Sequence, residues 1–335
     1  MHPLARGLAA AVIAATLPTV ALAETAAPTE VNFGIISTES QNNLKTIWEP
    51  FLADMQAETG LAIKPFFATD YAGVIEGMRF GKVDTAWFGN KSAIEAVDRA
   101  KGEVFAQTVA ADGSPGYWSV LITQADSPLT SLDDALKCDA SLNFGMGDPN
   151  STSGFLVPTT FIFAAKGIDP KSCFKAVRNA NHETNALAVA NGQVDLATNN
   201  TENMARLAVT NPEAFKKIKV IWTSPLIPSD PLVWRSDLDP IVQDKLMRFF
   251  MSYGRAGTPE EVAKHREILK ALGWAPFRPS SDAQLYPVRI MEVTKKIFQV
   301  KADEKLSAEE KAAEVKTLDA KKAELEKLMA TVPQT

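Results

Sequence analysis

Two stretches of this sequence repeat one local pattern, and the repetition constrains the fold more than any other feature. Residues 71–88 and 185–198 each show helical spacing of apolar residues, then Gly-x-Val-Asp, then a strand-like run. A short apolar run and a polar turn precede each copy. The repeated unit predicts two similar α/β lobes. In such lobes, the loops at the carboxyl ends of the strands face the ligand site.

Strand-like and helix-like segments alternate along the rest of the chain. The apolar run 31–36, the helical spacing over 40–59 and the run 61–67 begin the series. We predict two lobes, each with a mostly parallel sheet flanked by helices. The expected crossings between lobes are 118–123 and 231–235. Lobe one is expected to be discontinuous, with residues 24–124 and 231–302. Lobe two is expected at 125–230, and a charged C-terminal helix with its tail at 303–335.

The first 23 residues predict a secretory signal peptide. Arg6 gives a short basic head, residues 7–22 are apolar, and Ala21-Leu22-Ala23 is a small-residue cleavage signal. We expect cleavage after Ala23 and a periplasmic protein. The formal net charge of the whole chain, −5, argues against nucleic acid or an anionic membrane as partner, because both require a basic surface.

Cys138 and Cys173 are the two cysteines of the sequence. Each precedes a predicted strand, at 142–145 and 175–179. If those strands are parallel neighbours, both thiols lie at one edge of the sheet. An oxidising compartment then favours a disulfide that closes a loop of about 35 residues. Two unpaired, buried thiols are the alternative.

From Asp303 to Ala330 the sequence is rich in Ala, Glu, Lys and Leu. A narrow apolar stripe follows one face of the predicted long helix: Val315, Leu318, Leu325 and Met329. The stripe fits packing along the same chain. Its spacing is also that of a coiled-coil contact, so a homodimer through this helix is the second interpretation.

The stretch 147–158 is the clearest candidate for a binding site. Ser151, Thr152 and Ser153 follow a strand-like run and precede a helix-like run over 155–166. The first N–H groups of a helix lack intrahelical partners and the dipole is positive there, so three hydroxyls at this point predict an oxyanion site. Gly154 is expected to let a ligand approach the backbone. An ordinary helix N-cap is the simpler interpretation.

The sequence offers little support for a metal site. Beyond the leader, the histidines are His182 and His265. No His-Glu-x-x-His, no Cys pair at ligand spacing and no calcium-loop pattern occurs, so we expect no metal and no cofactor. His182 follows the polar turn of the second repeat. It is interpreted either as a general base beside Glu183 or as a hydrogen-bonded residue of a cleft.

Several runs, in order along the chain, resemble one known family. They are Asp70–Gly73, Thr108–Val120, Gly147–Pro158, Gly192–Asn203 and Ser224–Pro231. Together they closely resemble the periplasmic phosphonate-binding proteins of bacterial phosphonate ABC importers, from about Val31 to about Leu285. The resemblance implies a type II periplasmic binding protein whose two lobes close on the ligand like a Venus flytrap. It also implies a membrane permease with its ATPase as partners.

The resemblance further implies roles for eight residues. Six would hold the phosphonate oxygens: Tyr71, Tyr117, Ser151, Thr152, Ser153 and His182. Glu202 and Asp230 would face the ammonium group of 2-aminoethylphosphonate, the expected ligand. Without the resemblance, each of these two carboxylates would be interpreted as a solvated loop acid or a helix N-cap. Charge supports the assignment, because two carboxylates beside an oxyanion site would repel plain phosphate but would hold a zwitterion.

Two other functions are open at this point. One is binding of a different small oxyanion, such as phosphate, phosphite or sulfate. The other is a periplasmic phosphoesterase with a hydroxyl from 151–153 as nucleophile and His182 as base. The sequence lacks a Gly-x-Ser-x-Gly elbow and a Gly-x-x-x-x-Gly-Lys phosphate loop. We therefore expect a binding protein that captures its ligand by lobe closure, not an enzyme.

Overall fold

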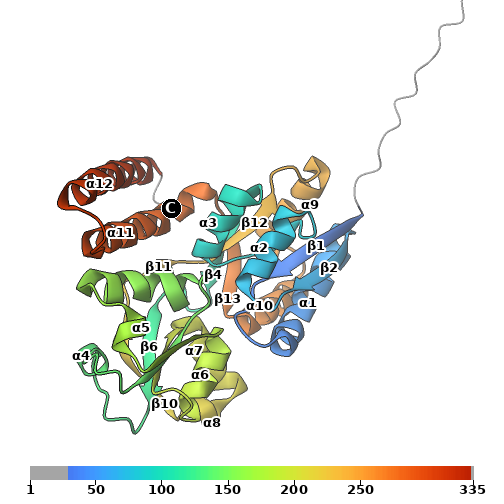
Figure 1. The fold of residues 1–335 in the computed structure, drawn as a ribbon. Coiled ribbons are helices and arrows are strands. Elements are labelled where there is room, and N and C mark those ends of the chain that lie inside the picture. The colour runs from blue at the N-terminus through green and yellow to red at the C-terminus, as the bar shows by residue number, and fades with distance from the viewer. Residues whose placement is uncertain (1–28, 333–335) are drawn as a thin grey trace, which may run out of the picture.

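The computed structural model describes residues 29–332, which form two lobes and a pair of C-terminal helices (Figure 1). The predicted signal peptide, 1–23, lies outside the described residues. Between residues 29 and 332 no helix combines the length and the apolar composition that crossing a bilayer requires.

Lobe one is built on a six-stranded sheet with the order β13-β4-β12-β3-β1-β2. Its strands are β1 (Glu30–Ile35), β2 (Ala62–Phe67), β3 (Thr85–Trp87), β4 (Gly102–Ala110), β12 (Pro231–Arg235) and β13 (Trp274–Pro279). Its helices are α1 (Gln41–Thr59), α2 (Tyr71–Arg79), α3 (Asn90–Arg99), α9 (Pro240–Ser252), α10 (Pro259–Ala271) and the short η4 (Asp282–Leu285).

Aromatic packing holds α1 onto this sheet. Trp48 of α1 is fully buried, and its ring lies 5.5 Å from Phe33 of β1 and 5.5 Å from Trp87 of β3. Trp274 of β13 contacts the same ring at 5.4 Å, edge to face. One side chain therefore joins three strands, and burying it stabilises the lobe by about 2–3 kcal/mol.

Lobe two has a five-stranded sheet with the order β10-β6-β9-β7-β8. Its strands are β6 (Ser119–Gln124), β7 (Asn143–Met146), β8 (Ala176–Asn179), β9 (Leu196–Asn200) and β10 (Ile218–Thr223). Its α-helices are α4 (Leu132–Ala135), α5 (Pro170–Cys173), α6 (His182–Ala190), α7 (Thr201–Thr210) and α8 (Pro212–Phe215). Between β7 and α5 the chain forms a helix with two wide, π-helical segments and a narrower 3₁₀ turn: η1 (Thr152–Leu156), η2 (Thr159–Phe163) and η3 (Ala164–Lys166).

Both sheets are mixed, so the prediction of mostly parallel sheets is wrong. β1 runs parallel to β2 and β3, and β7 runs parallel to β8 and β9. The antiparallel pairs involve the strands beside the crossings: β4 leaves lobe one and β12 returns to it, while β6 enters lobe two and β10 leaves it. A strand that leaves a sheet and a strand that returns from the same side run in opposite directions.

The lobes are joined by a two-stranded antiparallel ladder, β5 (Gly116–Tyr117) with β11 (Ile227–Pro228). A Cβ on Gly116 would lie 1.9 Å from the Ile227 carbonyl oxygen, so the pairing requires glycine there. The predicted crossing at 118–123 is wrong, because β6 lies inside the lobe-two sheet between β9 and β10. The chain crosses at 111–118 and returns at 224–230, and the predicted return, 231–235, is β12 of lobe one.

The internal repeat extends to matching hydrogen bonds in the two lobes. The backbone and side-chain amides of Asn32 both donate to Asp84 Oδ2, at 2.8 and 3.1 Å. Asn143 donates to Asp195 Oδ2 in the same way, at 2.6 and 3.2 Å. Each asparagine begins an Asn-Phe-Gly run in the central parallel strand of its lobe. The loops that follow β1 and β7 are therefore equivalent.

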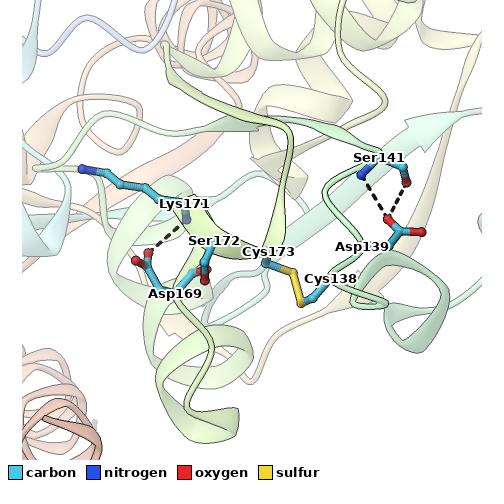
Figure 2. The surroundings of a disulfide bond; sticks show 7 residues. All are labelled: Cys138, Asp139, Ser141, Asp169, Lys171, Ser172 and Cys173. Carbon is cyan, nitrogen blue, oxygen red and sulfur yellow. Dashed lines mark hydrogen bonds between the residues drawn. A yellow bond between two sulfur atoms is a disulfide. The ribbon is translucent and has the colours of Figure 1, made fainter. Parts of the chain in front are cut away.

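Cys138 and Cys173 are bonded to each other (Figure 2). Parallel pairing of β7 with β8 places Asn143 opposite Ala176, so the segments before the two strands share one edge of the sheet. The loop that the bond closes contains β7, the stretch 147–158 and the helix that follows. The bond thus constrains the backbone that carries the predicted oxyanion site.

The chain ends in a helical hairpin, α11 (Tyr286–Ala302) and α12 (Ala308–Thr331). The predicted stripe packs against α11 in one apolar cluster: Val293, Ile297, Val315, Leu318 and Leu325. α11 also contacts helices of both lobes, α3 and η2 among them. The stripe therefore packs along its own chain, although Met329 is 39% exposed. Contact with a second copy stays a prediction.

Removing the disulfide should destabilise the protein. Cys138→Ser with Cys173→Ser opens a loop of 35 residues, and the entropy restored to the unfolded chain corresponds to roughly 3–4 kcal/mol. We expect calorimetry to show Tm lowered by roughly 5–10 °C. A reductant should lower the Tm of the wild type but not that of the double variant. Equal Tm values for the two proteins would contradict the prediction.

Candidate functional site

The stretch 147–158 does form a helix start, three residues before the predicted helical run at Phe155. Ser151 is the N-cap, and its Oγ accepts a hydrogen bond from the Gly154 N–H at 2.9 Å. The Leu156 N–H donates to the Ser151 carbonyl at 3.1 Å, which makes this first turn wider than an α-helical turn. All three hydroxyl residues thus lie in the cap and the first turn.

The three hydroxyl oxygens each accept one N–H donor already. Besides the bond to Ser151, Thr152 Oγ1 accepts from the Lys91 backbone N–H at 2.9 Å, and Ser153 Oγ accepts from Asn200 Nδ2 at 3.0 Å. A hydroxyl that accepts in this way still has its own proton to donate. All three residues are 2% exposed. The arrangement therefore presents buried O–H donors that suit an anion.

The two glycines of this loop serve the fold, and the prediction that Gly154 makes room for a ligand is wrong. A Cβ on Gly154 would lie 3.0 Å from the Gly147 Cα and 3.1 Å from His182 Cε1. A Cβ on Gly147 would lie 2.5 Å from the Gly154 backbone. The Gly147 N–H donates to the Gly154 carbonyl at 2.9 Å. The space is occupied by the protein's own backbone.

Lobe one faces this loop with the starts of two helices. The Tyr71 N–H of α2 donates to Asp148 Oδ2 at 3.2 Å. The N-cap of α3 is Gly89, which has no side chain to cap the helix, and Thr152 of lobe two accepts the Lys91 N–H instead. Helix starts from both lobes therefore converge on one space, and their dipoles favour an anion there.

Hydrogen bonds determine the tautomer of His182. The Asn203 N–H donates to Asn200 Oδ1 at 2.7 Å, so Asn200 Nδ2 must face Ser153 and, at 3.3 Å, His182 Nε2. Nε2 then accepts, and the ring proton is on Nδ1. Burial, with a smaller contribution from Arg206, lowers the pKa of His182 to about 4. The imidazole is therefore neutral at pH 7, and Nδ1–H is its only donor.

The same geometry bears on the interpretation of His182 as a base. Ser151 Oγ lies 3.4 Å from His182 Nε2, an arrangement similar to a nucleophile and its base. However, His182 Nδ1 has no hydrogen-bond partner within residues 29–332, whereas a catalytic imidazole is normally oriented by a third group. The geometry favours a hydrogen-bonded cleft residue.

Two carboxylates complete the site. Asp230 is 6% exposed and accepts from the Tyr117 hydroxyl at 3.1 Å. Glu202 is partly buried in the first turn of α7. Burial and, second, the Glu202 carboxylate raise the pKa of Asp230 well above its usual value, and burial raises that of Glu202. The Tyr117 proton is directed to Asp230, so in this structure Tyr117 belongs with the acidic pair rather than with the hydroxyl loop.

All eight predicted residues line one small cavity between the lobes, with a volume of about 20 Å³. This is about the room that one water molecule needs, so a ligand can enter only when the lobes separate. Seven lining residues were missed: Ile36, Thr38, Trp87, Gly89, Asn200, Asn203 and Arg206. The repeat was a usable signal for the first two, because they follow β1 as the hydroxyl loop follows β7.

Four polar atoms of cavity-lining side chains are buried without a hydrogen-bond partner in the described part of the chain: Thr38 Oγ1, Trp87 Nε1, His182 Nδ1 and Asn203 Oδ1. Buried polar groups are nearly always satisfied, because an unpaired one costs about 1–3 kcal/mol. A cluster of four around one cavity indicates a site for a polar ligand with both donors and acceptors.

Comparison with known proteins gives concordant matches. A family model described as ABC transporter, phosphonate, periplasmic substrate-binding protein matches residues 33–285. The chain is 57% identical to the phosphonates-binding periplasmic protein of Escherichia coli K12, over 89% of this chain and 86% of that protein. A solved binding-protein component of an ABC phosphonate transporter from Pseudomonas aeruginosa matches with a TM-score of 0.87 and 56% identity, over 90% of this chain and 98% of that one.

A more distant relative is named for a different anion. The phosphate-import protein of Mycolicibacterium smegmatis is 30% identical over 70% of this chain and 75% of that protein. Similarity alone therefore leaves the choice of anion open, and the residues of the site must decide it.

The assigned state of His182 can be measured. We expect ¹⁵N NMR at pH 5.5 to show a neutral imidazole with its proton on Nδ1, because a pKa of about 4 keeps the ring uncharged. Comparison with His182→Asn assigns the signals. The charged ring is disfavoured in the fold, so this residue reduces stability as the pH falls from 6.5 to 4. A titration midpoint near 6.5, or a proton on Nε2, would refute the assignment.

Proposed function

The chain belongs to the family of periplasmic substrate-binding proteins of phosphonate ABC transporters, and on that premise we propose that it captures 2-aminoethylphosphonate between its lobes for delivery to the importer. Family members are binding proteins and not enzymes. The predicted leader and the family both support a periplasmic location. A membrane permease and its ATPase are the proposed partners.

One observation supports the choice of ligand: three buried hydroxyls and a pair of carboxylates line one cavity. A Cβ built on Gly89 would lie 3.3 Å from Thr152 Oγ1 and 3.9 Å from Asp230 Oδ1, so the hydroxyl and the carboxylate oxygen are at most about 7 Å apart. A two-carbon zwitterion such as 2-aminoethylphosphonate is short enough to place its opposite charges within that distance. The phosphonate would accept from the hydroxyl loop while the ammonium donates to the carboxylates.

The carboxylates argue against plain phosphate as the preferred ligand. Burial makes both acids difficult to ionise, and each raises the cost of ionising the other. A dianion would add a further repulsive charge, whereas an ammonium removes the repulsion between the acids. The phosphate named for the M. smegmatis relative makes phosphate the second candidate. We place it behind the zwitterion because of Asp230 and Glu202.

Closure of the lobes is the proposed capture step. The two crossings are short: β5 and β11 pair only with each other and are flanked by loops. Such segments suit a hinge. Contacts across the cleft would have to break for the lobes to separate; for example, the Ser40 N–H of lobe one donates to Glu183 Oε2 of lobe two at 2.7 Å. The closed form is the one we expect the permease to recognise.

Calorimetric titration of the mature protein tests the ligand. We expect 2-aminoethylphosphonate to bind at least about a hundredfold more tightly than methylphosphonate or phosphate, since leaving buried carboxylates unpaired costs a few kcal/mol. Glu202→Gln with Asp230→Asn should weaken binding of the amino compound far more than that of methylphosphonate. Equal losses for both ligands would remove the ammonium-site assignment. Comparable binding of phosphate by the wild type would favour the second candidate.

Binding should also release protons. Burial and the Glu202 carboxylate raise the pKa of Asp230 well above its usual value, so the closed, ligand-free site holds a proton on the pair to a higher pH than a solvated carboxylate would. An ammonium group lowers the pKa of both acids, so affinity for the amino compound should rise with pH until the pair is fully ionised.

Titrations in two buffers of different ionisation enthalpy, neither of them a phosphate or sulfonate, would measure the protons released. Methylphosphonate is the control for ionisation of the phosphonate itself. Asp230→Asn should abolish the difference between the two ligands. Proton uptake with the amino compound would contradict the prediction.

A further inference from the structure

The repeat identifies a second loop at the cleft besides the hydroxyl loop. The loop after β1, residues 36–40, is equivalent to the loop after β7, and both end in a serine N-cap, Ser40 and Ser151. Ile36 and Thr38 line the cavity. Between them and the helix lies Glu39, a carboxylate that is only 5% exposed. A buried carboxylate is costly unless it is paired, so Glu39 is expected to have a counter-ion.

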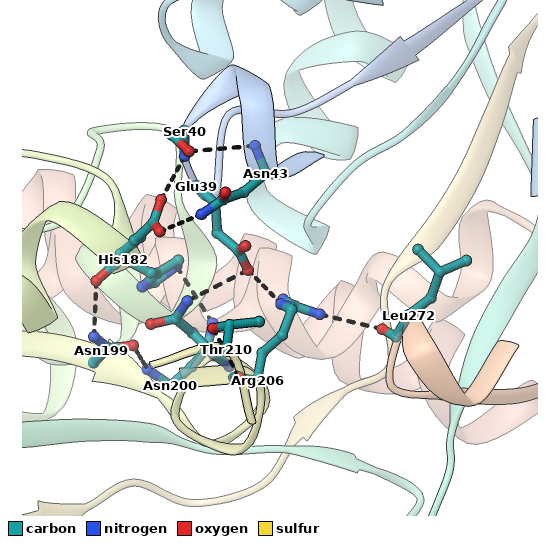
Figure 3. Close-up of polar contacts among 11 residues, drawn as sticks. Glu39, Ser40, Asn43, His182, Asn199, Asn200, Arg206, Thr210 and Leu272 are labelled. Carbon is teal, nitrogen blue, oxygen red and sulfur yellow. Dashed lines mark hydrogen bonds and ion pairs between the residues drawn. The ribbon is translucent and has the colours of Figure 1, made fainter. Parts of the chain in front are cut away.

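The partner of Glu39 is Arg206, which reaches it from α7 of the other lobe (Figure 3). Arg206 Nε donates to Glu39 Oε1, and Arg206 Nη1 donates to the Leu272 carbonyl of lobe one at 3.1 Å. The side chains of the ion pair are 5% and 13% exposed. Lobe one thus supplies both acceptors for a cation carried by lobe two.

The ion pair matters because Arg206 also lines the ligand cavity. The guanidinium follows Glu202 by one helical turn, and its charge favours ionisation of Glu202. Without Glu39, Arg206 would be the nearest counter-ion for the acidic pair and would compete with a ligand ammonium. Glu39 therefore keeps the charge of Glu202 and Asp230 available for the ligand.

Glu39 also orients an amide. Asn203 Nδ2 lies 3.5 Å from Glu39 Oε1, and a carboxylate can only accept, so the amide nitrogen must face Glu39. The Asn203 carbonyl oxygen is then fixed on the other side, buried and without a partner in the part of the chain the structure describes. Asn203 is 3% exposed and lines the cavity. Its Oδ1 is a neutral acceptor with a free lone pair in the cavity wall, on the residue next to Glu202.

We propose that Asn203 Oδ1 is a third acceptor for the ligand ammonium and that Glu39 is the positioning residue that makes the ammonium subsite selective. Glu39 acts in two ways: it neutralises Arg206 and it holds the Asn203 oxygen toward the cavity. Because Glu39 comes from lobe one while Asn203, Arg206 and Glu202 come from α7, the subsite is complete only in the closed protein. The proposal rests on the proposed function, since it concerns the same ligand.

The test is a selectivity ratio, the Kd of methylphosphonate divided by the Kd of 2-aminoethylphosphonate, measured by calorimetry. Glu39→Gln keeps the shape of the side chain but removes its charge and lets it donate to Asn203. We expect the ratio to fall by about tenfold or more, the scale of one charged hydrogen bond. Asn203→Leu removes the acceptor without changing any charge, and the ratio should fall about three- to tenfold.

Glu183→Gln is the matched control. Glu183 also joins the lobes, through Ser40 and Asn43, but it does not line the cavity. Its replacement should weaken both ligands alike and change the ratio by less than about twofold. Adding Arg206→Gln to Glu39→Gln removes the competing cation, and the double variant should recover the part of the ratio that was lost through charge but not the part that depends on Asn203.

The outcomes separate the two proposals. A high ratio in the wild type that Glu39→Gln and Asn203→Leu leave unchanged would overturn the positioning role while keeping the ligand. A fall in the ratio with Glu183→Gln equal to that with Glu39→Gln would assign the effect to closure alone and would also overturn it. A wild-type ratio near one would refute the proposed ligand itself.

Discussion

Unpaired N–H groups at helix starts are the constraint on which the closed cleft depends. Three helices of lobe one begin at the cleft, and each receives an oxygen from lobe two: Glu183 for Ser40, Asp148 for Tyr71 and Thr152 for Lys91. Water can replace these oxygens when the lobes separate, so opening leaves no donor unsatisfied. The helix starts are therefore compatible with an open and a closed cleft. When the lobes close, these helix starts lie together and form a site that is rich in donors.

The closed cleft must also pair its buried charges. Arg206, Glu39, Glu202 and Asp230 all lie between the lobes, and taking them out of water is costly unless each is paired. The cavity wall contains one cation, Arg206, and its ion pair with Glu39 leaves an excess of two acids, Glu202 and Asp230. A ligand with an ammonium group is the natural complement of that excess. In the proposed function, the same acids that weaken an empty closed form make the filled one selective.

The distribution of rigid and movable parts follows from this arrangement. The hydroxyl loop lies within the segment that the disulfide closes, and two glycines bring its backbone into contact with itself. The donors are thus pre-organised inside one lobe. Glu39 and Tyr71 come from the other lobe and arrive only on closure. In the proposed capture, recognition of the anion precedes closure, whereas recognition of the cation accompanies it.

Local sequence was sufficient where a feature depends on neighbouring residues. Apolar periodicity predicted the strands and helices, and the hydroxyls at 151–153 predicted a helix start, because caps act over three or four residues. The repeated Gly-x-Val-Asp predicted two similar lobes. The hydroxyls at 151–153 also predicted the oxyanion site. The ligand-binding roles of the other five residues in the cavity, however, were taken from the family resemblance, and spacing alone would have left Glu202 and Asp230 as surface acids.

Tertiary structure decided everything that depends on partners distant in the sequence. Strand direction in the sheets depends on which strand returns from the other lobe, so β6 and β12 could not be assigned from their own residues. Gly154 was expected to face a ligand and instead faces Gly147 and His182. Arg206 was invisible as a site residue because its partner, Glu39, is 167 residues away. The sequence by itself determined the local elements and the donors of the cleft. Packing alone determined which charges meet there, because pairing depends on distance in space and not along the chain.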